Sequence, residues 1–304
     1  MLDRYSFEIL AYVEAGGKRA YSWRELVDKL AISGSRATQT RKALLEAGLL
    51  EGEGDRLHIT PAGLLALEPY RVRRAVIFAA GFGSRMVPVT LHTPKPLVKV
   101  GGIRIIDRLL DALLAQGIDD IVIVRGYLKE RFDELLEKYP MLTFVDNGLY
   151  DRENNISSAL AAGEKINGCY ICAGDLLVTN PRIIRKYHYC SNYLASFALE
   201  TDDWCFDFRN GLAENYRKGG TNCFNQYEIT YWTSGDCEKL RRDWALAYRT
   251  EGGRDLFWEF IPLVLYRDRY QVEIRQCRKE DIMEIDNYYE LAELDPSYRE
   301  EKAK

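Results

Sequence analysis

The sequence predicts an α/β protein in which a mostly parallel, mixed sheet is preceded by a small helical domain. From Val72 onward, short β-branched runs alternate with segments of helical periodicity, which is the pattern of βαβ units. A glycine-rich loop follows the first of these runs, at the strand end where such sheets bind their ligands. The residues before Val72 show helical periodicity with short breaks. We therefore expect two domains, residues 1–70 and 71–304.

The first domain is expected to hold three helices, a β-hairpin and a closing helix. Ser22, with Glu25 three residues later, forms a capping box for the second helix, Gly48 ends the third, and Pro61 starts the last one after Thr60. The three helices are expected over 7–14, 23–30 and 36–47, and the hairpin over 49–60.

This order of elements resembles the winged helix, a helix-turn-helix variant of many bacterial DNA-binding domains. The resemblance makes the third helix the recognition helix and the hairpin the wing. Acidic residues between Glu46 and Asp55 offset the nearby positive charge, so docking of a protein partner or dimerisation stays open beside DNA binding. The side chains that could contact DNA are Ser33, Ser35, Arg36, Thr38, Gln39, Thr40, Arg41 and Lys42.

In the second domain, apolar runs bounded by glycines predict buried strands, and apolar residues at helical spacing predict the helices between them. Strands are expected over 72–80, 118–126, 141–145 and 169–174. Helices are expected over 104–117 and 127–139, from about Ile156, and from Pro181.

Composition narrows the class of protein. The chain has 304 residues, of which 47% are hydrophobic, and a formal net charge of -4. This charge argues against a protein that mainly wraps nucleic acid, so any such role would be confined to one part. No apolar run approaches the roughly 18 residues of a membrane span, and the N-terminus lacks a signal-peptide pattern. We expect a cytoplasmic protein with no membrane interaction.

Seven cysteines, an odd number, favour reduced thiols over a disulfide framework. Cys169 and Cys172 form a CxxC within a predicted strand, where residues three apart face opposite sides. We interpret them as buried strand residues rather than as a metal or redox pair.

The loop after the first strand of the second domain reads AAGFGSRM, and TPKPL follows. Closely spaced glycines let backbone N–H groups surround a phosphate, and Arg85 and Lys95 add positive charge. A dinucleotide fingerprint would need a third glycine where Met86 stands, and the P-loop spacing is absent. The loop therefore predicts a nucleotide-phosphate site of another type.

The segment FAAGFGSRMVPVTLHTPKPL matches the signature of nucleotidyltransferases that make NDP-sugars and CDP-alcohols. The resemblance runs from about Val72 to Leu294 and implies a Rossmann-like nucleotidyltransferase fold. The chain looks most like the bacterial CTP:phosphocholine cytidylyltransferases, which activate phosphocholine for decoration of surface polysaccharides. The motifs that carry this closer resemblance are VRGYL, ENNISSA, AGD, ITYWT, LFWEFIP and MEIDN.

The resemblance implies that a phosphate oxygen of phosphocholine attacks the α-phosphorus of CTP and that pyrophosphate leaves. No protein nucleophile is required, so catalysis rests on positioning and charge neutralisation. Lys95 and Arg85 match the catalytic basic residues, and Asp175 and Asp286, each after a short apolar strand, match the Mg²⁺ ligands. The expected nucleotide-binding residues are Ala80, Gly81, Gly83, Ser84, Asn154 and Ser157. A helix-capping role is open for Asn154 or Asn155.

Trp204, Phe257 and Glu259 are expected to bind the choline end, because a quaternary ammonium is recognised by aromatic faces and a carboxylate. The family pattern has Tyr and Asp where this chain has Phe257 and Glu259, which leaves open a smaller ammonium, as in phosphoethanolamine or 2-aminoethylphosphonate. Trp258, between apolar neighbours, is interpreted as core.

Two other functions stay open. A sugar-1-phosphate nucleotidyltransferase would share the glycine loop and the carboxylates but would need polar groups for sugar hydroxyls. A winged-helix regulator could use the second domain as a nucleotide sensor, but such a sensor need not keep Lys95, Asp175 and Asp286.

Overall fold

The computed structural model describes residues 1–16, 23–30, 33–52 and 56–299, and within them the chain forms two compact units. Unit 1 comprises Met1–Arg71 with Tyr187–Tyr189, and unit 2 comprises Val72–Lys186 with Cys190–Lys304. Within the described residues, no helix is both long and apolar enough to cross a membrane.

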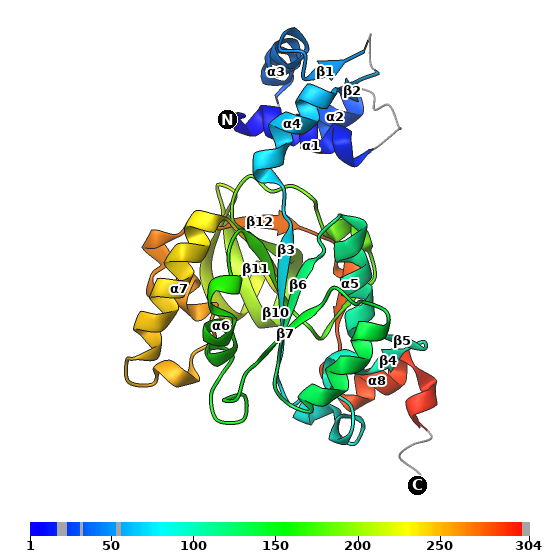
Figure 1. Ribbon diagram of the computed structural model, residues 1–304. Helices are drawn as coiled ribbons and strands as arrows, with labels where there is room; N and C mark the ends of the chain where they lie inside the picture. Colours follow the sequence, from blue (N-terminus) through cyan, green and yellow to red (C-terminus); the bar gives the residue numbers. More distant parts are fainter. Residues whose placement is uncertain (17–22, 31–32, 53–55, 300–304) are drawn as a thin grey trace. The chain divides into compact units, whose positions relative to one another are not determined.

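The described residues of unit 1 form helices and an antiparallel pair of short strands (Figure 1). Asp3 caps the first helix by accepting a hydrogen bond from Ser6 N at 2.9 Å, and Thr60 caps the last by accepting one from Gly63 N at 3.0 Å. Ser22, the expected cap of the second helix, and positions 53–55 of the expected hairpin lie outside the described residues. The elements are α1 (Arg4–Ala15), α2 (Trp23–Leu30), α3 (Gly34–Glu46), β1 (Leu50–Glu51), β2 (His58–Ile59) and α4 (Pro61–Leu67).

Unit 2 is built on a seven-stranded mixed sheet in the order β10-β12-β11-β8-β3-β6-β7. Strands β8, β3, β6 and β7 run parallel, β12 is parallel to β10, and β11 is antiparallel to β8 and β10. The strands are β3 (Arg74–Ala79), β6 (Asp120–Arg125), β7 (Thr143–Asp146), β8 (Cys169–Ala173), β10 (Asn192–Arg209), β11 (Leu212–Trp232) and β12 (Glu273–Gln276). The sheet is mixed and mostly parallel, as the sequence predicts.

Helices cover both faces of this sheet: α5 (Ile105–Ala115) lies on one, and α6 (Ile156–Ala162) and α7 (Ser234–Tyr248) lie on the other (Figure 1). Alternate residues of β3 point to opposite faces, so the sheet separates two hydrophobic cores. Cys172 packs into the core beside α5 and Cys169 into the core beside α6 and α7. Both thiols are free and buried, in agreement with their interpretation as strand residues.

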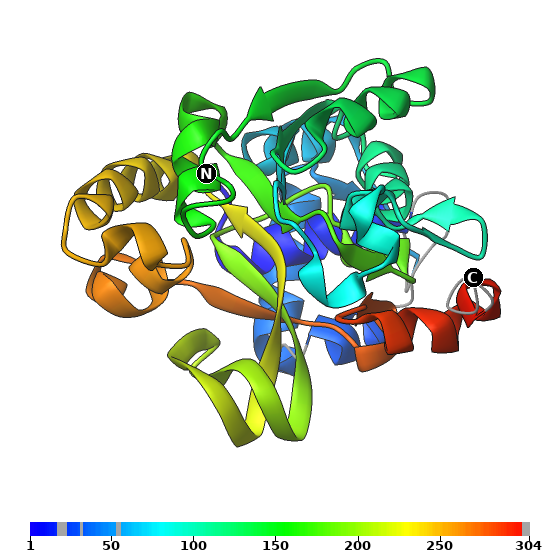
Figure 2. The ribbon, with the colours of Figure 1, turned by 90° about the horizontal axis from the view of Figure 1, so that it is seen from below.

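Strands β10 and β11 extend well past the sheet. β10 pairs with β12 over Asn192–Ala195, and β11 pairs with β8 over Ile229–Trp232. Most of their remaining length pairs only within the two-stranded ribbon that they form, which curls away from the sheet in Figure 2. We call this part the β10–β11 ribbon.

Short pairs complete unit 2. β9 (Leu176–Val178) pairs with β13 (Ile282–Glu284), and β4 (Lys99–Val100) pairs with β5 (Ile103–Arg104). Helix α8 (Tyr288–Leu294) follows β13.

Two expected helices are wrong. Residues Lys129–Glu137, within the predicted helix 127–139, form a 3₁₀-helix. Its buried residues Phe132 and Leu135 are three apart, so they share one face at three residues per turn. The helix expected from Pro181 is a single 3₁₀ turn, Pro181–Ile183, in which the Asn180 side chain accepts a hydrogen bond from Arg182 N.

Candidate active site

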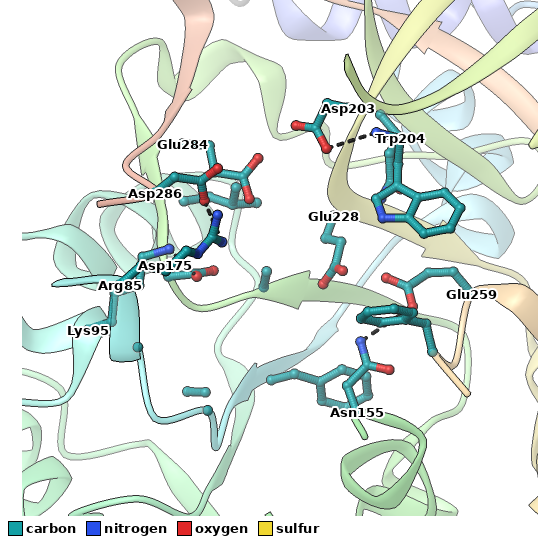
Figure 3. Close-up of a pocket in the computed structure, with 18 of the residues that line it drawn as sticks. Arg85, Lys95, Asn155, Asp175, Asp203, Trp204, Glu228, Glu259, Glu284 and Asp286 are labelled. Atoms are coloured by element: carbon teal, nitrogen blue, oxygen red, sulfur yellow. Dashed lines mark hydrogen bonds and ion pairs between the residues drawn. The ribbon is translucent and has the colours of Figure 1, made fainter. Parts of the chain in front are cut away.

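A pocket of about 870 Å³ opens at the carboxyl ends of β3 and β8 and reaches the β10–β11 ribbon. This is the sheet end where ligands of α/β proteins bind. The pocket has the size of a small-molecule site. The predicted residues Ala80, Gly81, Gly83, Ser84, Arg85, Lys95, Asp175, Trp204, Phe257, Glu259 and Asp286 all line it (Figure 3).

The glycine loop packs tightly against the segment that carries Lys95. Gly83 has a left-handed backbone with φ of 65°, and a Cβ there would lie 3.1 Å from Lys95 Cβ and 3.2 Å from Thr90 Cγ2. Thr90 Oγ1 donates a hydrogen bond to Gly83 O at 2.9 Å. Glycine is therefore required at this position both for its conformation and for the space it leaves.

Lys95 is 7% exposed and lies between two prolines that restrict its backbone. Its Nζ donates a hydrogen bond to Asp175 Oδ2 at 2.7 Å. Burial alone lowers the pKa of Lys95, but the attraction and hydrogen bond of Asp175, aided by Glu284 and Asp286, outweigh it, and the pKa rises above its usual value. The ammonium group is thus a fixed positive charge inside the pocket.

The β9–β13 pair brings Asp175 to the end of the pocket that carries Glu284 and Asp286, about a hundred residues later in the sequence. Glu284 pairs in register with Leu176, which places Asp175 and Asp286 at the same end of the pocket (Figure 3). Arg85 Nη2 forms an ion pair with Asp286 Oδ1 at 2.9 Å. Burial and the repulsion of Asp175 and Asp286 raise the pKa of Glu284 to about 7. The negative charge here exceeds what the nearby lysine and arginine neutralise.

At the far end of the pocket, aromatic rings stand beside carboxyl groups. Trp204 stacks on Tyr216 at 4.8 Å between ring centroids and meets Phe257 edge-on at 6.0 Å. Glu259 is 1% exposed, and its Oε2 accepts a hydrogen bond from Asn155 Nδ2 at 3.4 Å. An aromatic wall with a buried acid is chemically suited to a cation. Trp258 is fully buried in the core, as predicted.

Asn154 and Ser157 do not belong to the pocket lining; Asn155 and Ser158 take these places. Positions three apart share one helix face, so this pair faces the cavity from the start of α6 and the expected pair faces elsewhere. Asn154 Oδ1 accepts a hydrogen bond from Asn155 N at 2.7 Å, and Ser157 Oγ donates one to Asn154 O at 2.7 Å. The expected pair therefore organises the start of the helix.

Sequence reasoning also missed Asp203, Glu228 and Glu284, which line the pocket. Glu228 gave a usable signal, because it is the single charged residue of the otherwise apolar and polar-neutral run CFNQYEITYW. A charge in such a run, on a strand with one buried face, points to a site.

Comparisons with known proteins agree with this geometry. Residues 75–218 match the family model of the MobA-like NTP transferase domain. The chain is 35% identical to a 2-aminoethylphosphonate cytidylyltransferase of Lancefieldella rimae over 74% of this chain and 92% of the relative. It is 30% identical to a choline-phosphate cytidylyltransferase of Haemophilus influenzae over 70% of this chain and 92% of the relative.

Among solved structures, the CTP:phosphocholine cytidylyltransferase from Streptococcus pneumoniae is similar, with a TM-score of 0.68 and 27% identity. The match covers 75% of this chain and 99% of that one. Because sequence and structure agree over nearly the whole length of these relatives, the chain belongs to the bacterial cytidylyltransferases, within the nucleotidyltransferases.

Proposed function

We propose that this cytidylyltransferase uses Mg²⁺ to transfer CMP from CTP to a small acceptor that carries both a phosphate or phosphonate and an ammonium group. One observation carries the proposal: a single pocket has Lys95 and Arg85 at one end and Trp204, Phe257 and Glu259 at the other. Phosphocholine, which the sequence predicts, has both charges, and so do phosphoethanolamine and 2-aminoethylphosphonate.

The carboxylates at the phosphate end suit Mg²⁺. Among the described residues, no three His, Cys, Asp or Glu side chains gather into a site that could hold a metal ion. Mg²⁺ needs only one or two carboxylates when phosphate oxygens and waters complete its coordination shell. The mutual repulsion of Glu284, Asp175 and Asp286 would be relieved by a bound cation. Asp175 and Asp286 would hold the ion. When bound, it would neutralise charge on the transferring phosphate.

The protein's own part in the reaction is positioning and electrostatics. Lys95, fixed by Asp175, and Arg85 offset the negative charge that spreads over the α-phosphate and the leaving pyrophosphate. Anchoring the acceptor's ammonium beside Glu259 leaves its phosphate or phosphonate oxygen free to attack the α-phosphorus in line. Holding both reactants in this way supplies much of the rate enhancement.

Pyrophosphate release tests this function. The protein is incubated with Mg²⁺ and each of the four NTPs against phosphocholine, phosphoethanolamine, 2-aminoethylphosphonate and a set of sugar-1-phosphates. Release with CTP and the ammonium-bearing acceptors alone supports the proposal. Release with a sugar phosphate supports a sugar nucleotidyltransferase, and absence of release with every pair supports a sensor domain.

We also propose that residues 1–70 form a winged helix. The support is the order of elements, three helices, an antiparallel strand pair and a fourth helix. Arg36 and Arg41, expected to contact DNA, lie over the rings of Tyr5 and Trp23 at 5.3 and 5.2 Å. A DNA titration at two salt concentrations tests binding, because contacts to phosphates weaken as salt rises.

A further inference from the structure

Glu228 is an acidic residue of the pocket to which the proposed transfer assigns no role. It lies on β11 between the buried residues Tyr227 and Ile229, and its side chain enters the pocket. Figure 3 shows the side chains of Glu228 and Glu259 pointing toward one another below Trp204. The two carboxyl groups come from β11 and from the segment before the π-helical turn Ile261–Leu265, and both line the pocket.

Two buried carboxylates that point toward one another repel, and this repulsion favours protonation. Burial, followed by the repulsion of Glu259, raises the pKa of Glu228 well above its usual value. Within the described residues, no lysine or arginine forms an ion pair with either glutamate. The pair is therefore a preformed acidic site that forms no ion pair with a basic side chain in the described part of the chain.

A third acceptor lies in the same pocket. Gln226 Nε2 donates a hydrogen bond to Tyr216 Oη at 3.3 Å, and the amide oxygen of Gln226 remains as an acceptor. This oxygen, Gln226 Oε1, is buried and receives no hydrogen bond from the described part of the protein. A buried acceptor without a donor costs about 1–3 kcal/mol, which a ligand N–H group would relieve.

Hydrogen-bonding capacity separates the candidate acceptors. A trimethylammonium group has no N–H, so it offers no donor to the oxygens of Glu228 and Gln226 or to the Glu259 oxygen that Asn155 does not reach. A primary ammonium has three N–H donors for these acceptors. Resting on the proposed function, we propose that Glu228 is the specificity-determining residue that selects acceptors with a primary ammonium, as in phosphoethanolamine and 2-aminoethylphosphonate, over quaternary phosphocholine. On binding, the ammonium takes the place of a proton held by this acidic pair, and that proton leaves to water.

A methylation series measures this selection in the wild-type protein. Initial rates are measured with CTP and phosphoethanolamine, its N-methyl and N,N-dimethyl derivatives, and phosphocholine, with 2-aminoethylphosphonate as the phosphonate arm. The value of kcat/KM should fall with each of the three added methyl groups, by about 1,000-fold in total, because each lost charge-assisted hydrogen bond is worth about tenfold. Equal or higher kcat/KM for phosphocholine overturns the proposal.

Variants assign the selection to one residue. Glu228→Gln should lower kcat/KM for phosphoethanolamine about 10- to 100-fold and should reduce its advantage over phosphocholine. Glu228→Asp, which keeps the charge, should retain part of the preference. A merely structural role would lower kcat/KM for all acceptors alike and would overturn the proposal.

Glu200→Gln serves as the matched control. Glu200 is an exposed carboxylate on β10 that does not line the pocket, so the ratio between the two acceptors should stay within about twofold, the range of an ordinary surface substitution. If no ammonium-bearing acceptor supports pyrophosphate release, the proposed function itself fails. If these acceptors react without preference for a primary ammonium, only the present inference fails.

Discussion

Replacing Asp175 by Asn separates the role of this residue in the reaction from its role in the fold. The change removes the negative partner of Lys95, whose side chain is 9% exposed, whereas the Asp175 side chain is 32% exposed. Breaking a fully buried pair costs about 3–5 kcal/mol. Because water reaches Asp175 and Glu284 still attracts Lys95, we expect a loss of about 1–2 kcal/mol of unfolding free energy.

The expected loss of turnover is larger. Removing a charge that acts on the transferring phosphate costs about 10³-fold in kcat, equivalent to about 4 kcal/mol. The assay is pyrophosphate release at saturating CTP and acceptor over a Mg²⁺ titration, with urea unfolding on the same sample. A purely structural ion pair would instead lower stability and leave kcat of the folded protein unchanged.

Asp120→Asn is the matched control. Asp120 begins β6 and forms an ion pair with Arg74 at 2.6 Å, at the end of the parallel strands opposite the pocket. Its loss should change unfolding free energy by at most about 1 kcal/mol and should leave kcat intact. Wild-type kcat in folded Asp175→Asn at saturating Mg²⁺ would refute the reasoning.

Three further predictions concern other parts of the site. Trp204→Ala should raise KM for the acceptor about tenfold through loss of the aromatic face and leave KM for CTP unchanged, as initial rates will show. Gly83→Ala should lower the unfolding free energy by about 1–3 kcal/mol. The loss should exceed that of Gly101→Ala, because Gly101 also has a left-handed backbone (φ of 61°) but an added Cβ there would meet no atom within 4 Å. Equal losses in thermal melts would disprove the packing argument. Because burial and Glu259 raise the pKa of Glu228 above 4.5, the native state holds more protons than the unfolded chain above that pH. Unfolding free energy should therefore fall as pH rises from about 5 to 8, and urea titrations of Glu228→Gln should show a shallower fall.

Periodicity predicted the fold where local sequence and tertiary packing agree. The parallel strands β3, β6 and β8 are continuous apolar runs, so their burial on both faces could be predicted from the sequence. The segment Lys129–Glu137 has strong helix formers, and residues three apart, such as Phe132 and Leu135, share a face in both helix types, so neither propensity nor periodicity distinguishes the 3₁₀-helix from an α-helix here.

The site was predictable where a residue's type and its neighbours in sequence both signal chemistry. Lys95 between two prolines and Asp175 after a strand met that condition. Glu284 did not, because its place beside Asp175 follows from the β9–β13 pairing, which joins segments about a hundred residues apart. At the start of α6 the motif indicated the correct helical turn but the wrong residues of it. Asn154 and Ser157 were expected in the pocket, whereas Asn155 and Ser158, one position later, face it.

The acidic pair at the far end of the pocket is best understood beside a buried acid that serves the fold. Asp243 is fully buried, and it accepts hydrogen bonds from Arg269 Nη1 at 2.6 Å and Tyr270 Oη at 2.8 Å, so its charge is neutralised inside the protein. Glu228 and Glu259 instead point toward one another inside the pocket, and burial with their mutual repulsion raises the pKa of Glu228. Such an arrangement lowers the folding stability and contributes nothing to the fold. Proteins retain destabilising groups of this kind at functional sites, where a ligand compensates them. A ligand with both a positive charge and N–H donors would neutralise the two carboxylates and also satisfy their hydrogen bonds. A ligand with charge alone would neutralise them but leave their hydrogen bonds unmade.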